Sequence, residues 1–188
     1  MMIQHPPRIR HDYPLKTAFH VRSKPTAPLF QCHCSSPLGD VLLAASEQGL
    51  AGVWFVQGQQ HMPDTSGWHT NNTPPTLKAA AQQLAEYFSG LRHAFDVPLH
   101  LTWGTPFQRA VWQALQRIPY GHTSTYGDIA RDIGNPKAVR AVGAAIGQNP
   151  HTIIVPCHRV VGVKGSLTGF AGGLERKNFL LVHEVTHA

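Results

Sequence analysis

Residues 126–148 read YGDIARDIGNPKAVRAVGAAIGQ, and this stretch decides the fold that is expected around them. Two short helical patterns flank Gly134-Asn135, so we expect the first helix to end there and the asparagine to cap the second, with Pro136 at its first position. Such a pair has the form of a helix-turn-helix. The second helix would turn Lys137 and Arg140 away from the core, where they suit contacts with phosphates. An ordinary surface helix with two solvated cations is the alternative.

Further helices are predicted on both sides of this pair. The segment Thr105-Pro106-Phe107-Gln108 combines a capping threonine, a proline at the first helical position and a glutamine three residues after the threonine. Apolar residues follow at helical spacing as far as Ile118, and Pro119-Tyr120-Gly121 ends the pattern. A last helix is predicted over about Leu174 to Glu184. Residues 101–188 are therefore expected to form a helical domain that contains the helix-turn-helix.

The preceding part of the chain has a different pattern. Val41-Leu42-Leu43 and Val53-Trp54-Phe55 are β-prone runs separated by turn residues, which predicts a small antiparallel sheet. Apolar residues recur at helical spacing over residues 76–89, and Gly90 ends that helix. Residues 29–100 are therefore expected to form an N-terminal domain of one sheet and one helix. The fold class of the whole chain is α+β.

Length and composition place the chain among ordinary folded proteins. It has 188 residues, of which 42% are hydrophobic and 14% charged, so a packed core is expected. No apolar run approaches the roughly 20 residues that span a membrane. Residues 1–28 contain five prolines and no continuous apolar stretch, and we interpret them as a flexible basic tail rather than a secretory signal. A cytoplasmic protein is expected.

Net charge indicates the kind of partner to expect, and the cysteine content indicates whether disulfides are expected. The net charge is +6, and residues 100–188 alone carry nine basic and four acidic groups, which favours a polyanionic partner for that half. Three cysteines, an odd number, argue against a disulfide framework. Cys32 and Cys34 are separated by one residue, which fits alternating positions on a strand better than the wider spacing of zinc ligands.

Cys157 is the candidate nucleophile. A soft thiolate removes an alkyl group from a base directly, but a free thiol is mostly protonated at neutral pH and needs a base nearby. His158 is adjacent in sequence, and a carboxylate could fix its tautomer. The candidates in this half of the chain are Asp128, Asp132, Glu175 and Glu184. Glu184 is favoured because it lies among apolar residues of the last helix, where an acid requires a partner. A structural cysteine–histidine pair is the alternative.

The heptapeptide Val155-Pro156-Cys157-His158-Arg159-Val160-Val161 matches the active-site motif of the O6-alkylguanine-DNA alkyltransferases, also called methylated-DNA–protein-cysteine methyltransferases. The resemblance extends over most of the C-terminal half. It includes Gly104–Gln108, Trp112, Tyr120-Gly121, Thr125–Gly127, Gly134–Gly143, Asn149-Pro150, Gly169–Gly173 and Leu180–Glu184. The N-terminal half resembles the bacterial constitutive members only in its layout of a small sheet with one helix.

This resemblance implies catalytic roles for five residues. Cys157 would accept the alkyl group from guanine O6, and His158 would take the thiol proton through a water molecule. Glu184 would hold His158. Tyr126 would donate its hydroxyl to guanine N3 as the base leaves, which is acid assistance in the transition state. Asn149 would brace the turn that carries the cysteine.

The resemblance also implies contacts with the damaged base and the DNA. Arg140 would fill the gap left by a flipped-out base, from a helix lying in the minor groove. Backbone groups of Cys157 and Val160 would recognise the guanine amino group, and the Ala171 amide would donate to O6. Phe170 stands where family members usually carry tyrosine, so a hydroxyl contact is lost there while the ring remains for packing.

The function implied by the resemblance is DNA repair by a single-turnover suicide methyltransferase. Its partner would be double-stranded DNA containing O6-alkylguanine, with O4-alkylthymine as a second lesion. A thioether at Cys157 has no thiolate left, so each molecule would act once. No cofactor, no metal and no obligate protein partner are expected, and the protein is expected to be a monomer.

Two functions of other classes remain as alternatives. The first is a helix-turn-helix regulator whose cysteine is merely buried, which would bind DNA sequence-selectively and form no covalent product. The second follows from His183-Glu184-Val185-Thr186-His187, which spells the H-E-x-x-H signature of zinc hydrolases. That pattern ends one residue before the end of this sequence, in the last turn of a predicted terminal helix, where fraying is common.

Overall fold

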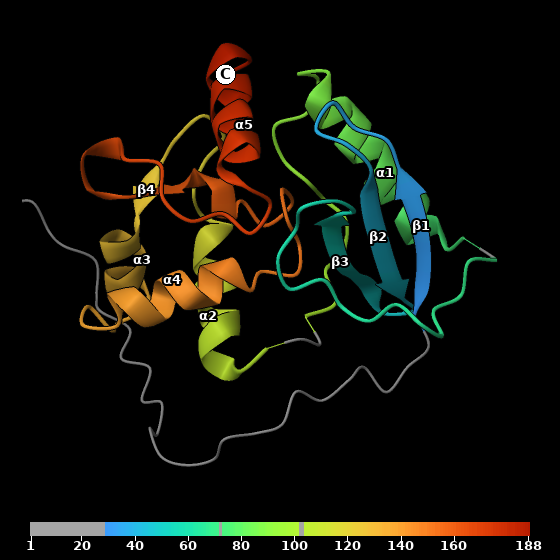
Figure 1. The fold of residues 1–188 in the computed structure, drawn as a ribbon, viewed down its shortest axis with the longest axis horizontal. Coiled ribbons are helices and arrows are strands. Elements are labelled where there is room, and N and C mark those ends of the chain that lie inside the picture. Colours follow the sequence, from blue (N-terminus) through green and yellow to red (C-terminus); the bar gives the residue numbers. More distant parts are fainter. Residues whose placement is uncertain (1–28, 72, 102–103) are drawn as a thin grey trace, which may run out of the picture.

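A computed structural model describes residues 29–71, 73–101 and 104–188, so the predicted tail lies outside the described residues. Three antiparallel strands in the order β1 (Phe30–Cys34), β2 (Val41–Ser46) and β3 (Gly49–Phe55) form a sheet. Helix α1 (Pro75–Phe88) packs on this sheet, and together they form one side of the molecule (Figure 1). The predicted small sheet with one helix is confirmed.

Both faces of the sheet are covered, which explains why β2 and β3 are buried along their whole length. On one face, Leu43 and Val53 belong to a core that also contains Leu77 and Leu84 of α1. The opposite face has its own small cluster, which consists of Leu29, Leu42, Ala44, Ala51 and Trp54, with Trp68 packed against it. Cys32 and Cys34 occupy alternate positions of β1 and pack against the first core, as expected for a strand.

Helices dominate the other side of the molecule (Figure 1). The elements are α2 (Pro106–Leu115), β4 (Ser124–Thr125), α3 (Tyr126–Asp132), α4 (Val139–Gly147), η1 (Cys157–Arg159), β5 (Val160–Val161), η2 (Val163–Gly165) and α5 (Leu174–Thr186). The capping box predicted for α2 is present, because the Thr105 hydroxyl accepts from the Gln108 backbone N–H. The helix ends at Leu115 rather than Ile118, since the Ile118 N–H bonds to the carbonyl only three residues before it.

The predicted start of the second helix in the helix-turn-helix, Pro136, is wrong by three residues. Helix α4 begins at Val139, and Asn135 does not cap it. Gly134 adopts φ +74°, and the Asn135 N–H bonds to the Ala130 carbonyl at 2.9 Å, so these two residues close α3 in a Schellman motif. The Ala138 N–H then bonds to the Asn135 carbonyl at 3.0 Å, which makes Asn135 the first residue of a turn.

The two sides of the molecule are joined along the edge of β3. The Val53 N–H donates to the Pro150 carbonyl at 2.7 Å, and the Thr152 N–H donates to the Val53 carbonyl at 3.1 Å. Ile153 from the same segment, and Leu180 of α5, are members of the core between the sheet and α1. The segment that leads to Cys157 is therefore anchored to the N-terminal sheet.

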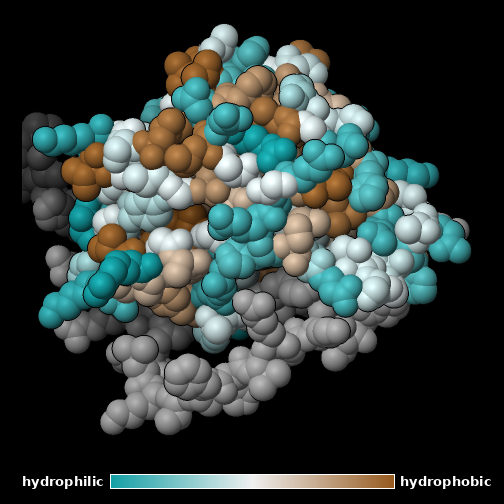
Figure 2. Space-filling model, viewed as in Figure 1, coloured by the Kyte–Doolittle hydropathy of each residue, from teal (hydrophilic) through white to brown (hydrophobic). Residues whose placement is uncertain are grey.

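On the face seen in Figure 2, hydrophobic residues lie in several small groups separated by polar ones. Helix α5 contributes exposed apolar side chains at Leu174, Phe179, Val182 and Val185. No helix in the described part of the chain is both long and apolar enough to cross a membrane.

Candidate active site

A short parallel ladder that sequence reasoning missed brings Cys157 and Tyr126 to the same site. Strand β5 directly follows the 3-10 helix of Cys157, and β4 directly precedes Tyr126. The two strands pair in parallel, with Ser124 opposite Val160. Two-residue strands carry too little periodicity for detection in a sequence. Their pairing nevertheless sets the position of the predicted nucleophile relative to the predicted acid.

The Asn149 side chain makes two hydrogen bonds within the turn that precedes Cys157. The Asn149 side-chain NH₂ donates to the Val155 carbonyl at 2.9 Å, and its oxygen accepts from the His151 N–H at 3.0 Å. Within this turn Ile153 adopts φ +74°, a left-handed conformation that is strained for a β-branched residue. Because Ile153 is only 1% exposed, its packing in the core holds the strained backbone in place.

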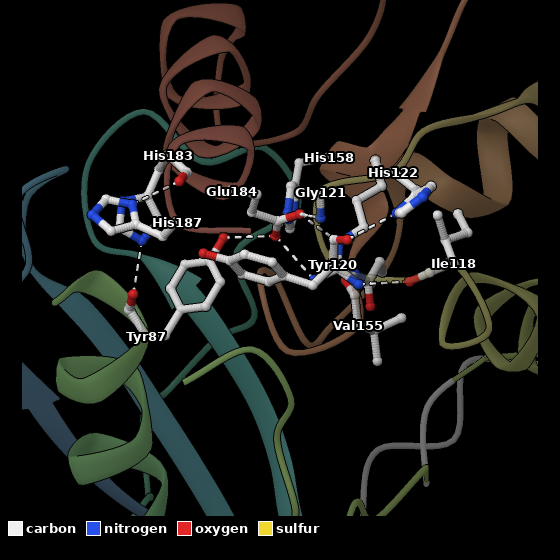
Figure 3. A network of polar contacts seen from close by, with 12 residues as sticks. Tyr87, Ile118, Tyr120, Gly121, His122, Val155, His158, His183, Glu184 and His187 are labelled. Atoms are coloured by element: carbon white, nitrogen blue, oxygen red, sulfur yellow. Dashed lines mark hydrogen bonds and ion pairs between the residues drawn. The ribbon is translucent and has the colours of Figure 1, made fainter. Parts of the chain in front are cut away.

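Glu184 lies at the centre of a buried polar network (Figure 3). Its carboxylate accepts hydrogen bonds from His158 Nε2 at 2.7 Å, Arg159 Nε at 2.8 Å and Tyr87 Oη at 2.8 Å. The backbone N–H of Gly121 adds a further bond at 3.1 Å. Burial alone would raise the pKa of Glu184, but the hydrogen bonds from His158 and Arg159, together with the Arg159 charge, lower it to about 2. Glu184 is therefore ionised at neutral pH.

This network fixes the tautomer of His158. A carboxylate only accepts hydrogen bonds, so Nε2 carries the hydrogen and Nδ1 keeps its lone pair. Nδ1 is buried and makes no hydrogen bond within the described part of the chain. Burial lowers the pKa of His158, although Glu184 opposes that shift. His158 is thus a neutral imidazole whose Nδ1 can accept a proton.

The Cys157 thiol is 4% exposed and lies within a buried run of residues. Burial raises the pKa of the thiol. The Asn149 side chain, the Lys177 ammonium and the backbone N–H groups of Cys157 and His158 act in the opposite direction. Burial therefore favours the protonated thiol, whereas the neighbouring polar groups and the lysine favour the thiolate.

Tyr126 begins α3, where the Thr125 hydroxyl caps the helix by accepting from the Asp128 N–H. Its own hydroxyl donates to the Thr168 carbonyl at 2.9 Å and lies 3.5 Å from the Gly169 carbonyl. The hydroxyl is on the exposed side of the site, in contrast to the buried Cys157.

Two of the predicted base-contacting residues, Phe170 and Ala171, lie on the loop that enters α5. Phe170 is half-buried and packs against both large cores. The carbonyl of the next residue, Ala171, accepts from the Gln60 N–H at 2.8 Å, so the N-terminal half holds this loop too. The Val160 carbonyl, in strand β5, accepts from Lys177 Nζ at 2.6 Å.

Lys137 and Arg140 are exposed, Lys137 in the turn before α4 and Arg140 in its first helical turn. They are therefore apart from the buried network and available to a partner outside the molecule. Small residues accompany them, because Ala141 and Ala144 are also exposed on α4. This face combines two cations with little steric bulk, which suits close approach to a phosphate backbone.

Sequence reasoning missed two residues of the site, Lys177 and Tyr87. Lys177 is buried between the strand that follows Cys157 and the loop beside Tyr126. Its spacing of seven residues from Glu184 places the two on one helix face, and this signal was available in the sequence. Tyr87 comes from the other half of the chain, and no local pattern links it to Glu184.

The H-E-x-x-H pattern does not form a metal site in this fold. Glu184 is bound by His158 and Arg159. His183 Nε2 is bonded to the Tyr87 carbonyl at 2.7 Å, and His187 Nδ1 to the His183 carbonyl at 2.8 Å. Among the residues that the structure describes, no group of three or more histidine, cysteine, aspartate or glutamate side chains could hold a metal ion.

Comparisons with known proteins agree with this arrangement. Residues 32–101 match the family described as "6-O-methylguanine DNA methyltransferase, ribonuclease-like domain", and residues 106–186 match its "DNA binding domain". A relative from Methanosarcina acetivorans, named methylated-DNA–protein-cysteine methyltransferase, is 51% identical over 78% of this chain and 92% of its own length. A relative of the same name from Mycolicibacterium paratuberculosis is 48% identical over 81% of this chain and 90% of its own length.

Solved structures show the same fold. The Mycobacterium tuberculosis protein OGT in complex with DNA superimposes with a TM-score of 0.79 at 45% sequence identity, covering 85% of this chain and 94% of that one. The chain therefore belongs to the methylated-DNA–protein-cysteine methyltransferase family. The family resemblance and the α+β fold class expected from the sequence are confirmed.

Proposed function

We propose that this protein repairs DNA by moving the alkyl group of O6-alkylguanine onto the sulfur of Cys157. The observation that carries the proposal is a buried cysteine followed directly in the chain by a buried, neutral histidine whose Nε2 is held by Glu184 at 2.7 Å. We also propose that residues 29–100 form an N-terminal domain and that residues 101–188 form a DNA-binding domain. The proposal also covers O4-alkylthymine as a second lesion and a monomer as the acting species.

The first step is removal of the thiol proton. His158 Nδ1 has a lone pair and would take the proton through a water molecule, while Glu184 stabilises the imidazolium that forms. Asn149 and the backbone N–H of His158 stabilise the thiolate. These groups offset the burial that otherwise keeps the thiol protonated.

The second step is displacement at carbon. The thiolate attacks the alkyl carbon, the S–C bond forms as the C–O6 bond breaks, and the electron pair of the broken bond stays on the guanine. Tyr126 would donate its hydroxyl to guanine N3, and the Ala171 N–H would donate to O6 as charge develops there. The proton lost from sulfur returns through His158 and solvent, so the products are guanine and a neutral thioether.

The lesion has to leave the duplex to reach this sulfur. Cys157 is only 4% exposed, and enzymes that react with a buried atom of a base extrude the nucleotide from the stack. Arg140, which is exposed in the first turn of α4, would occupy the gap from the minor groove, and Lys137 would contact phosphates. Phe170 would pack against the extruded base, and the Val160 carbonyl would accept from its amino group.

The mass of the intact protein tests the proposal. After incubation with duplex DNA containing O6-methylguanine, we expect a gain of about 14 Da, one CH₂, located on Cys157 and limited to one per molecule. Cys157→Ala should lose transfer and keep DNA binding, and the matched control Cys34→Ala should keep both. Transfer by Cys157→Ala would refute the assignment of the nucleophile. Sequence-selective binding without a covalent product would support the regulator alternative instead.

A further inference from the structure

One buried charge beside the site has no role in the steps above. Lys177 is fully buried on α5, and its Nζ donates to the carbonyls of Val160 at 2.6 Å, Thr168 at 2.6 Å and Gly169 at 3.2 Å. An ammonium group has three N–H donors, so all three are used. A lysine is rarely buried without such partners, because desolvation of its charge is costly.

The three carbonyls belong to two different segments of the chain. Val160 begins the strand that follows Cys157, whereas Thr168 and Gly169 lie in the loop that leads to α5. Tyr126 donates its hydroxyl to the same Thr168 carbonyl at 2.9 Å. Lys177 therefore connects the backbone beside the nucleophile with the backbone that holds the hydroxyl of the acid.

The other charges near Cys157 largely balance one another. On its own 3-10 helix, His158 is kept neutral by burial and Arg159 is paired with Glu184 of α5 at 2.8 Å. Asn149 and the backbone N–H groups contribute dipoles only. In the described part of the site, Lys177 is the cation whose hydrogen-bond partners are all uncharged carbonyls. Its charge is therefore not cancelled by a carboxylate.

We propose that Lys177 is a positioning residue of the site around Cys157, which joins the Val160 segment to the Thr168–Gly169 segment and places a positive charge near Cys157 that favours its thiolate. The proposal rests on the proposed function for the identity of the nucleophile. It also explains how Tyr126 can leave the Thr168 carbonyl to reach a base. Lys177 stays bonded to that carbonyl, so the loop keeps its position and the carbonyl keeps a hydrogen-bond partner.

The pH profile of thiol reactivity separates charge from structure. We would measure alkylation of Cys157 by iodoacetamide against pH in Cys32→Ser/Cys34→Ser protein, so that one thiol reports. Lys177→Gln keeps donors for the carbonyls and removes the charge, and should raise the midpoint by about one pH unit or more. Lys177→Arg should restore a midpoint near that of the parent. Lys78→Gln, a matched change of an exposed lysine on α1, should not move it.

A reciprocal measurement keeps the test decisive even if Lys177→Gln fails to fold. Burial lowers the pKa of Lys177 to about 8, and the sulfur of Cys157 opposes that shift. Removing the sulfur in Cys157→Ala should therefore lower the titration midpoint of Lys177 further, as followed by NMR of the lysine ammonium groups. The proposal would be overturned if folded Lys177→Gln showed the parental pH profile of Cys157 alkylation. It would also be overturned if the titration midpoint of Lys177 were the same with and without the Cys157 sulfur.

The two proposals fail in different ways. Iodoacetamide needs no DNA, so a shifted profile in Lys177→Gln would stand even if the parent took no methyl group from O6-methylguanine. Conversely, a parent that accepts the methyl group but whose thiol profile ignores Lys177 would uphold the repair function and refute the role of the lysine.

Discussion

His158 Nε2 and Glu184 Oε1 lie 2.7 Å apart although the two residues are separated by 26 positions in the chain. Both side chains are buried, and Arg159 and Tyr87 bind the same carboxylate. The pair therefore contributes to stability as well as to the proposed chemistry. Removing one member of such a buried network leaves the other charges without a partner.

Glu184→Gln should consequently weaken both the fold and alkyl transfer. The neutral amide leaves the buried Arg159 guanidinium without a counter-ion, and we expect a loss of about 3 kcal/mol or more in the free energy of unfolding. Urea unfolding measures this loss. Glu175→Gln, a change of an exposed glutamate on the same helix, serves as the control and should alter stability little. Equal stability of the two variants would contradict the network.

Tyr126→Phe should affect the reaction far more than the fold. The ring stays packed, and Lys177 still occupies the Thr168 carbonyl, so we expect a stability change of about 1 kcal/mol or less. Loss of the acid should slow transfer from O6-methylguanine by about 100-fold. Quenched single-turnover assays measure the rate. Tyr120→Phe removes a buried hydroxyl with no hydrogen-bond partner among the described residues and should leave the rate unchanged.

Arg140→Ala should slow repair of duplex DNA selectively. If Arg140 fills the gap left by an extruded base, its loss makes extrusion more costly and should reduce the duplex rate by about tenfold or more. Transfer from free O6-methylguanine base needs no extrusion and should not change. Lys137→Ala should instead reduce the salt dependence of DNA binding by about one phosphate contact. An equal loss on duplex and free base would argue against the proposed role of Arg140.

His151 predicts acid sensitivity of the fold. Burial lowers its pKa to about 4, although a hydrogen bond to the Leu50 carbonyl opposes the shift. The unfolded chain binds this proton near pH 6.5, so stability should be lost as the pH falls from about 6.5 towards 4. His151→Gln keeps a donor for Leu50 and should reduce that loss by on the order of 3 kcal/mol.

Urea unfolding at several pH values tests this expectation. His33→Gln, at an exposed position of β1, is the control and should keep the parental pH dependence. Part of the acid sensitivity should remain in His151→Gln, because burial also lowers the pKa of His158. If His151→Gln lost as much stability as the parent between pH 6.5 and 4, His151 would have to accept a proton in the folded protein.

The helices and the sheet could be predicted from local signals, and the exceptions have local causes. The capping box at Thr105 and the glycine after α1 mark element ends directly. The predicted start of α4 is wrong because Gly134 and Asn135 can either cap a following helix or close a preceding one. Here they close α3. A sequence pattern does not reveal which of the two hydrogen-bonding arrangements is lower in free energy.

Sequence patterns could name candidate site residues one by one, whereas the tertiary contacts that join them could not be predicted from local signals. Residue chemistry singled out Cys157, His158 and Glu184 and the resemblance implied their roles, and the structure places the histidine and glutamate in contact. Tyr87 and the β4–β5 ladder depend on segments that meet only in the folded chain. Lys177 could be placed on the last predicted helix, but its burial could not be predicted because a lysine is usually exposed.

The strained turn at Ile153 has a consequence for any attempt to dissect the molecule. Ile153, Ile154 and Leu180 are packed against the sheet and α1, and β3 supplies the hydrogen bonds at Pro150 and Thr152. A fragment cut at the boundary between the halves would expose these side chains to water and release the distorted backbone. The β-sheet carries none of the proposed reacting groups. It nevertheless maintains the backbone conformation of the segment that leads to Cys157.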